Sequence, residues 1–279
     1  MTESLELDAE VPAPTKPVLE SHGPAEPVGY ALEGLVAYLT MQERPHNFLG
    51  LGLIDGLVVG AQRAVADGAR AVVVRSSLRN FCAGADVKLF DTAYEGRAPE
   101  ADLTTLLTVF DELPLPIVAS IHGVCVGGGL EVALACDLII AAESARIGSV
   151  EATIGVNPLM GAMQRVTQRA GATRAKEMAL LARRYDAHTL ERWNLINRVV
   201  PDDQLIDVTR AIAEELAHGP TIAHASSKAV ISLAAAEGVR EADRRMAQLQ
   251  EPLWSSADIR TGLEALAASG PGAARFEGK

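Results

Sequence analysis

Between residues 29 and 141 the chain alternates short apolar segments with segments of helical periodicity. A largely apolar run at 29–41 suits paired strands, and shorter runs typical of buried strands follow it. These shorter runs lie at 71–75, 116–121 and 137–141, separated by helical patterns at 53–66, at 103–112 and after the glycines at 127–129. Strands joined through a helix pair in parallel, with right-handed crossovers. The sequence therefore predicts an α/β core built on a parallel sheet.

The two ends of the chain differ from this core. Residues 1–27 contain six acidic residues, five prolines and a single lysine, Lys16. Such a segment buries too little apolar area to offset its ordering entropy, which predicts a flexible, acidic, proline-rich tail over 1–27. No strand pattern follows Pro201, and helical patterns lie at 203–217, 221–236, 240–249 and 258–268. We therefore expect a core over 28–200 and a helical C-terminal region over 201–279.

Composition and charge exclude several classes of protein. The 279 residues carry a formal net charge of -11, whereas nucleic-acid binders present a basic face to the phosphates. No apolar run approaches the roughly twenty residues that span a bilayer, and the N-terminus lacks a signal-peptide pattern. The three cysteines, Cys82, Cys125 and Cys136, have no metal-ligand spacing. We expect a cytoplasmic protein without structural disulfides, and neither nucleic acid nor membrane as a partner.

A glycine run next to a carboxylate is the strongest candidate for a functional site. Residues 126–131 read VGGGLE, and a second glutamate, Glu151, follows Glu131 by twenty residues. Three glycines at the start of a helix let backbone N–H groups approach a ligand oxygen closely. The first glutamate lies one turn into that helix. The pattern predicts an anion hole beside a base.

Four ordered segments resemble the crotonase (enoyl-CoA hydratase/isomerase) superfamily. They read NFCAGADVK at 80–88, PIVASIHG at 116–123, GGGLEVALACD at 127–137 and IGSVE at 147–151. The segment WNLINRVV at 193–200 is also similar to the stretch that leads into the family's helical region. The resemblance implies a crotonase-like spiral of repeated β-β-α units with a helical C-terminal part. It also implies an acyl-CoA thioester substrate, and homotrimers or dimers of trimers whose contacts involve residues 201–279.

The resemblance assigns roles to several backbone groups and side chains. Reactions of acyl-CoA thioesters build negative charge on the thioester oxygen, so the site needs fixed donors. By resemblance these donors are the N–H groups of Ala85 and Gly128. Ala83 and Asp86 would lie near the adenine of coenzyme A, and Lys88 near its phosphates. No metal and no further cofactor is implied, because the glycine run lacks the dinucleotide and Walker contexts.

The pair of glutamates favours one reaction of the family. Members that hydrate a double bond hold a water between two carboxylates, of which one takes a proton from the water and the other protonates the α-carbon. Glu131 matches the first position and Glu151 the second. We therefore expect an enoyl-CoA hydratase, with syn-type addition of water to a 2-enoyl-CoA, in fatty acid or related acyl-CoA metabolism. The alternatives are a Δ3-Δ2-enoyl-CoA isomerase or other enzyme of the superfamily, and a non-catalytic acyl-CoA-binding protein.

One segment departs from the hydratases of the family. They show a PGxGGTQR run after the second glutamate, whereas residues 158–165 read PLMGAMQR. Leu159, Met160 and Met163 would reshape the acyl pocket, or the methionines would only pack beneath a helix start. The segment PHNF at 45–48 resembles the family's RPxxxNA only loosely. His122, Cys125, Asp137 and Glu143 lie near the glycine run and are interpreted as structural.

Overall fold

The computed structural model describes residues 26–98 and 102–279. Its main sheet has six strands in the order β1-β2-β3-β4-β6-β9. In chain order they are β1 (Val28–Glu33), β2 (Val36–Met41), β3 (Ala71–Ser76), β4 (Ile117–Ile121), β6 (Leu138–Ala142) and β9 (Arg198–Val200). β1 is antiparallel to β2, and the other neighbours are parallel. The predicted parallel α/β core is confirmed.

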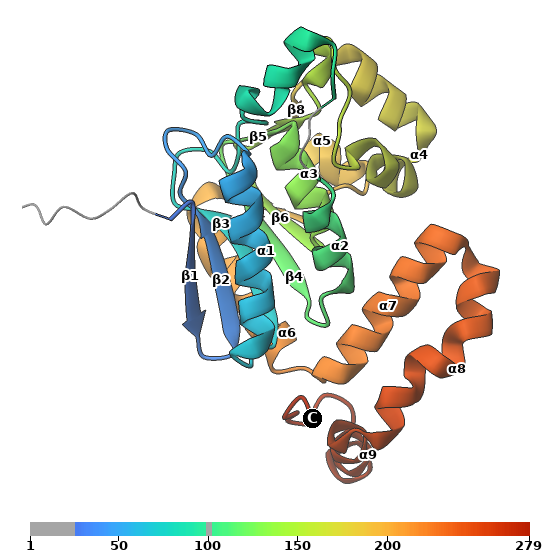
Figure 1. Cartoon of the computed structure of the whole chain (residues 1–279). Coiled ribbons are helices and arrows are strands. Elements are labelled where there is room, and N and C mark those ends of the chain that lie inside the picture. Colours follow the sequence, from blue (N-terminus) through green and yellow to red (C-terminus); the bar gives the residue numbers. More distant parts are fainter. Residues whose placement is uncertain (1–25, 99–101) are drawn as a thin grey trace, which may run out of the picture.

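Helices cover both faces of this sheet. The crossovers α1 (Leu51–Ala66), α2 (Thr105–Glu112) and α3 (Gly128–Ala135) lie on one face (Figure 1). On the other face, α6 (Leu205–Ala217) packs its buried Leu205, Ala213 and Ala217 against the strands. Every residue of α3 is buried, including Glu131, so this helix has no solvent-exposed face. The glycine-run helix is therefore held at the centre of the molecule.

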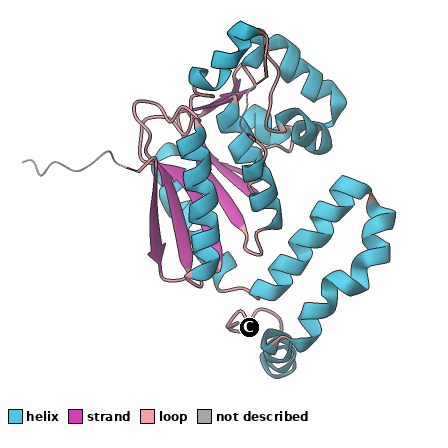
Figure 2. Cartoon of the chain, in the orientation of Figure 1, coloured by secondary structure: helices cyan, strands magenta, loops and turns pink. Residues whose placement is uncertain are grey.

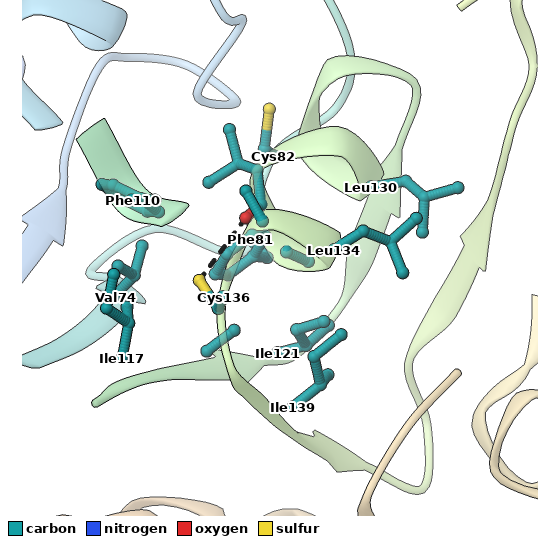
Figure 3. Close-up of a cluster of buried hydrophobic side chains, with 14 of the residues drawn as sticks. Val74, Phe81, Cys82, Phe110, Ile117, Ile121, Leu130, Leu134, Cys136 and Ile139 are labelled. Carbon is teal, nitrogen blue, oxygen red and sulfur yellow. Dashed lines mark hydrogen bonds between the residues drawn. The ribbon is translucent and has the colours of Figure 1, made fainter. Parts of the chain in front are cut away.

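The core below α3 combines side chains from helices and strands. Figure 3 shows Leu130 and Leu134 of α3 gathered with Phe110 of α2, Phe81 and the strand residues Ile117 and Ile139. The Cys136 thiol at the end of α3 donates to the Val132 carbonyl at 3.4 Å. Complete burial raises the pKa of this thiol, so it is held as a small neutral group. Close packing of this kind fixes the position of α3 on the sheet.

A second, smaller sheet was not predicted from the sequence. It contains β5 (Val124–Val126), β7 (Arg146–Gly148) and β8 (Tyr185–Asp186) in the order β5-β7-β8. Strands of two or three residues are too short to show an alternating pattern. The helices α4 (Ala162–Leu181) and α5 (Ala187–Arg192), near this sheet in Figure 1, were also not predicted.

The C-terminal part is helical, as predicted. It continues from α6 into α7 (Thr221–Glu237), α8 (Val239–Ser255) and α9 (Ala257–Ser269), which extend away from the sheet (Figure 2). Each of these three helices buries a single residue, namely Ser226, Ala242 and Asp258. Large apolar side chains such as Trp254 remain exposed on them. Although α7 and α8 pack against each other, the single chain therefore leaves apolar surface of this region exposed.

Most of the predicted tail, residues 1–25, lies outside the described residues. The last two residues of the predicted tail are attached to the end of β2. Gln42 donates from its side chain to the Glu26 carbonyl and from its backbone to the Pro27 carbonyl, both at 2.9 Å. Among the helices of the described ranges, none combines the length and the apolar character needed to cross a membrane.

Candidate active site

The segment around Cys82 runs beside β5, and the two bring two glycine turns together. The Cys82 N–H donates to the Val124 carbonyl, and the Val126 N–H donates to the Cys82 carbonyl, both at 3.1 Å. These bonds pair Cys82 with Cys125 in a parallel bridge. The turns that follow stay together, since a Cβ on Gly127 would lie 3.4 Å from the Gly84 Cα, and Ala85 and Gly128 are the next residues on each segment. The site is thus built by a pairing between segments more than forty residues apart.

A different close contact explains why each of the residues 127, 128 and 129 is a glycine. Gly127 has φ +55°, and a Cβ there would lie 3.4 Å from the Cα of Gly84, so the two turns are in contact. A Cβ on Gly128 would lie 2.7 Å from a methyl of Leu49, and one on Gly129 would lie 2.7 Å from the Cys82 carbonyl oxygen. The run is therefore needed for close approach of the two segments.

The two turns present unpaired backbone donors. The Leu49 N–H donates to the Gly84 carbonyl and the Asp86 N–H to the Leu49 carbonyl, a pattern that passes over the Ala85 N–H. Gly128 is the first residue of α3, where an N–H has no acceptor within the helix. Within the described ranges neither N–H has an intramolecular acceptor. Both residues line one cavity, so the two unpaired N–H groups belong to residues of the same site.

The cavity has a volume of about 230 Å³ and a mainly apolar wall. It lies between the two glycine turns, the 3-10 helix Val87–Glu95 and the 3-10 helix Glu151–Ile154. Its apolar side chains are Phe48, Leu49, Val87, Leu89, Phe90, Leu103, Val150, Ile154, Val156, Leu159 and Met160. Its ionisable lining residues are the two predicted glutamates, Glu131 and Glu151. The tertiary structure therefore brings both carboxylates and both donors to one site.

Glu131 is almost fully buried, with 4% of its surface exposed. Its Oε1 accepts the Met160 N–H at 2.5 Å and the Ala162 N–H at 3.4 Å, which orients the carboxyl group. Burial raises the pKa of Glu131 to about 7; the Met160 N–H opposes the rise and the charge of Glu151 adds to it. At neutral pH this group can therefore exchange a proton readily.

Glu151 follows β7 and begins the 3-10 helix Glu151–Ile154. Its Oε2 accepts the hydroxyl of Ser149 at 2.6 Å. Its Oε1 is buried and has no hydrogen-bond partner among the described residues. A Cβ on Gly127 would lie 3.6 Å from this oxygen, which places it at the start of α3. The two carboxylates thus meet the cavity from different elements and with different partners.

The three residues predicted to bind coenzyme A lie near the first turn, in different environments. Ala83 lines the cavity. Asp86 accepts the backbone N–H of Lys88 at 3.0 Å and so caps the 3-10 helix that follows. The Lys88 side chain is exposed. Neither Asp86 nor Lys88 is part of the cavity wall, so a group that reached them would lie outside the cavity.

The residues of the departing segment are separated by the structure. Leu159 and Met160 line the cavity, and Met160 is buried with 2% exposure. Met163 does not line the cavity. It packs partly buried against the core and borders a shallow surface depression with Pro158 and Gln164. The difference follows from α4, which begins at Ala162 and carries Met163 away from the cavity.

Three of the four side chains interpreted as structural have bonds or packing in the interior, and the fourth, Glu143, is exposed. The His122 Nε2 lies 2.7 Å from the Leu78 carbonyl, and Cys125 is fully buried. Asp137 accepts the Ile117 N–H at 2.7 Å and the Lys228 ammonium at 2.9 Å, which links β4 to α7. Burial raises the pKa of Asp137, and Lys228 opposes that rise. None of these three residues lines the cavity.

Two parts of the site were missed by sequence reasoning. The segment with the loosely matching residues 45–48 pairs with the first turn, since the Ala83 N–H donates to the His46 carbonyl at 3.1 Å. Phe48 and Leu49 then line the cavity. The loose match at 45–48 was the available signal for this segment. Ser149, in contrast, gave no signal, because a serine beside a glutamate is unremarkable in a sequence.

Comparison with solved structures identifies the fold. An enoyl-CoA hydratase subunit from Geobacillus kaustophilus superposes with a TM-score of 0.81 at 27% identity, over 91% of this chain and 98% of that one. An enoyl-CoA hydratase from Bacillus anthracis gives a TM-score of 0.78 at 28% identity, over 91% of this chain and all of that one. The parallel core, the paired glycine turns and the helical C-terminal region define a protein of the crotonase superfamily.

The chain belongs to the enoyl-CoA hydratase/isomerase family, whose model matches residues 32–271. A probable enoyl-CoA hydratase from Rhodobacter capsulatus is 34% identical over 85% of this chain and 93% of that protein. A mevalonyl-coenzyme A hydratase from Beauveria bassiana is 40% identical over 53% of this chain, and a carnitinyl-CoA dehydratase from Proteus mirabilis is 36% identical over 57%. These two alignments span 57% and 62% of the relatives' own lengths.

Proposed function

We propose that this protein is an enoyl-CoA hydratase, which adds water to a 2-enoyl-CoA thioester and gives a 3-hydroxyacyl-CoA. The observation that carries the proposal is the convergence of Glu131 and Glu151 on one cavity that also holds two unpaired backbone donors. A hydratase needs this set of groups: a base for the water, an acid for the α-carbon and donors for the thioester oxygen.

The N–H groups of Ala85 and Gly128 would bind the thioester oxygen. Attack of water on the β-carbon moves the π electrons of the double bond toward this oxygen, which becomes enolate-like. Donors that are already fixed stabilise this charge without reorganisation, and loss of one such donor costs about 3 to 4 kcal/mol. The N-terminal dipole of α3 adds to the stabilisation at Gly128.

The two carboxylates would divide the proton transfers. Glu131 accepts a proton from the water as its oxygen bonds to the β-carbon, and Glu151 gives a proton to the α-carbon as the enolate collapses. One water is consumed, Glu131 ends protonated and Glu151 ends ionised. A proton then passes from Glu131 to Glu151 through water before the next turnover. A pKa of about 7 at Glu131 supports this exchange at neutral pH.

Coenzyme A would enter beside the first turn, with Ala83 and Asp86 near its adenine and the exposed Lys88 near its phosphates. The C-terminal helices would form the contacts of a homotrimer or a dimer of trimers. Their exposed apolar side chains, such as Ile231 and Leu263, support that arrangement. Light scattering after size exclusion tests it, and a monomeric mass would contradict it.

The deciding experiment incubates crotonyl-CoA with the wild type, Glu131→Gln and Glu151→Gln, and follows mass and ultraviolet absorbance. We expect the wild type to add one water, and both variants to lose this activity by orders of magnitude. If the wild type leaves crotonyl-CoA unchanged but conjugates a 3-enoyl-CoA without change of mass, the isomerase is correct. Binding without any turnover would indicate the non-catalytic acyl-CoA-binding protein.

A further inference from the structure

Ser149 is a buried polar residue directly beside the candidate site. It is the first residue after β7 and has 1% of its surface exposed. Its hydroxyl donates to Glu151 Oε2 at 2.6 Å, a short bond to an acidic oxygen. A buried hydroxyl needs a partner, and the partner here is a carboxyl group of the proposed reaction.

This bond makes the two oxygens of Glu151 different. Oε2 is held by Ser149, whereas Oε1 is buried without a hydrogen-bond partner in the described part of the chain. Rotation of a carboxyl group about its last torsion is soft and nearly two-fold, so neither oxygen is fixed by the side chain alone. The hydroxyl of Ser149 therefore selects which oxygen lies beside Gly127 and the start of α3.

The backbone that carries Ser149 is itself anchored to the paired turns. The Gly148 carbonyl accepts the Gly127 N–H at 3.0 Å, and the Arg146 N–H donates to the Gly123 carbonyl at 2.8 Å. A Cβ on Gly148 would lie 2.2 Å from the Arg183 carbonyl oxygen, so this strand end is also tightly packed from the opposite side. Ser149 thus holds Glu151 relative to the same elements that present the Gly128 donor.

We infer that Ser149 is a positioning residue, which holds Oε2 of Glu151 so that Oε1 is the oxygen that transfers the proton to the α-carbon. This role rests on the proposed function of Glu151. With Oε2 accepting the serine proton, the acidic proton of the neutral carboxyl group resides on Oε1. On transfer the Oε1–H bond breaks, the Cα–H bond forms, and the carboxylate keeps its bond from Ser149.

The test compares Ser149→Ala with Ser149→Thr, which keeps a hydroxyl, and with Ser120→Ala as a matched buried-serine control. Ser120 lies on β4, its hydroxyl is hydrogen-bonded to that of Thr209 on α6 at 3.1 Å, and it does not line the cavity. We expect Ser149→Ala to lower kcat for crotonyl-CoA roughly 10- to 100-fold with KM within about two-fold, because a misplaced group costs rate more than binding. Ser149→Thr should recover most of kcat, and Ser120→Ala should keep it.

A second readout separates this role from the proposed function. Deuterium uptake at the α-carbon of butyryl-CoA in D2O reports proton transfer at that carbon without hydration, and Ser149→Ala should slow it by a similar factor. A kcat and an exchange rate within about two-fold of wild type would overturn the role of Ser149. So would equal losses in Ser149→Ala and Ser120→Ala that follow a lowered melting temperature.

The wild type decides between the remaining outcomes. A wild type that exchanges the α-proton but does not hydrate crotonyl-CoA would overturn the proposed function alone, and Ser149 would still be judged by the exchange rates. A wild type that catalyses neither reaction would overturn both.

Discussion

At the scale of single residues, Glu131 shows a conflict between stability and function. Its carboxyl group is buried in a mainly apolar wall, and its bonds come from the backbone at Met160 and Ala162. Removing a carboxylate from water favours the neutral form, which is why its pKa rises to about 7. The folded protein is therefore less stable when Glu131 is ionised than when it is neutral.

The free energy of unfolding should therefore depend on pH through Glu131. The raised pKa means that the folded state holds the Glu131 proton more tightly than the unfolded chain, whose glutamate has the ordinary pKa of 4.5. The contribution is complete below about pH 4.5 and is lost as pH rises through 7. The free energy of unfolding of Glu131→Gln, measured relative to that of the wild type, should therefore increase by about 2 to 3 kcal/mol from pH 5 to pH 8. Urea unfolding of both proteins at pH 5 and at pH 8 measures these free energies. A difference between variant and wild type that does not change with pH would contradict the prediction.

The same group should control the pH dependence of the reaction. In the proposed mechanism Glu131 accepts a proton and Glu151 gives one, so the reacting state of the pair holds a single proton. We therefore expect kcat/KM for hydration to fall as pH rises through about 7, where the pair loses its last proton. Initial rates from pH 5.5 to pH 8.5 in buffers of constant ionic strength measure this profile. A kcat/KM that rises across this range and stays high above pH 7 would contradict the need for a protonated acid.

At the scale of elements, the site depends on how closely α3 approaches the segment that contains Cys82. Gly129→Ala would place a methyl group 2.7 Å from the Cys82 carbonyl oxygen, which is backbone and cannot turn aside. We expect a loss of about 2 kcal/mol or more in stability, together with reduced activity, because the two donors would separate. Gly52→Ala in α1 is the control, since its nearest neighbour would lie 3.4 Å away. A Gly129→Ala variant as stable as this control would contradict the packing argument.

The long elements were predicted well and the short ones were not. The strands β2, β3, β4 and β6 and the helix α1 have clear periodic patterns, because each buries a continuous face or run of residues. β7, which orients Glu151 through the residue that follows it, has three residues and takes its form from its neighbours β5 and β8. Its position was predictable from the resemblance and not from its own pattern.

At the scale of the whole molecule, Arg70 joins the core to both ends of the C-terminal region. Its guanidinium donates to Thr221 Oγ1 at 2.8 Å, to the Phe276 carbonyl at 3.0 Å and to the Gly219 carbonyl. It is buried, with 8% exposure, so these bonds are sheltered from water. A set of bonds to a buried charge contributes more than an exposed ion pair does.

Arg70→Ala should therefore loosen the C-terminal helices while the sheet stays folded. Hydrogen exchange should increase at the start of α7 and around Phe276. The free energy of unfolding should fall by about 2 to 3 kcal/mol, which lowers the melting temperature. Arg63→Ala is the matched control, because Arg63 pairs with Asp67 on the surface. Unchanged exchange in α7 would show that other contacts, such as the one from Lys228 to Asp137, hold the helices.

The parallel core, the helical C-terminal region, the glycine run and the two glutamates could all be recognised along the chain. Periodicity and glycine runs are properties of neighbouring residues, so they can be read along the chain. The folded structure was needed to show that Ala85 and Gly128 line one cavity, that Met163 does not line it, and that Ser149 holds one oxygen of Glu151. The reason is physical: register, burial and the pKa of a carboxyl group depend on atoms from distant parts of the chain, which meet only when it folds.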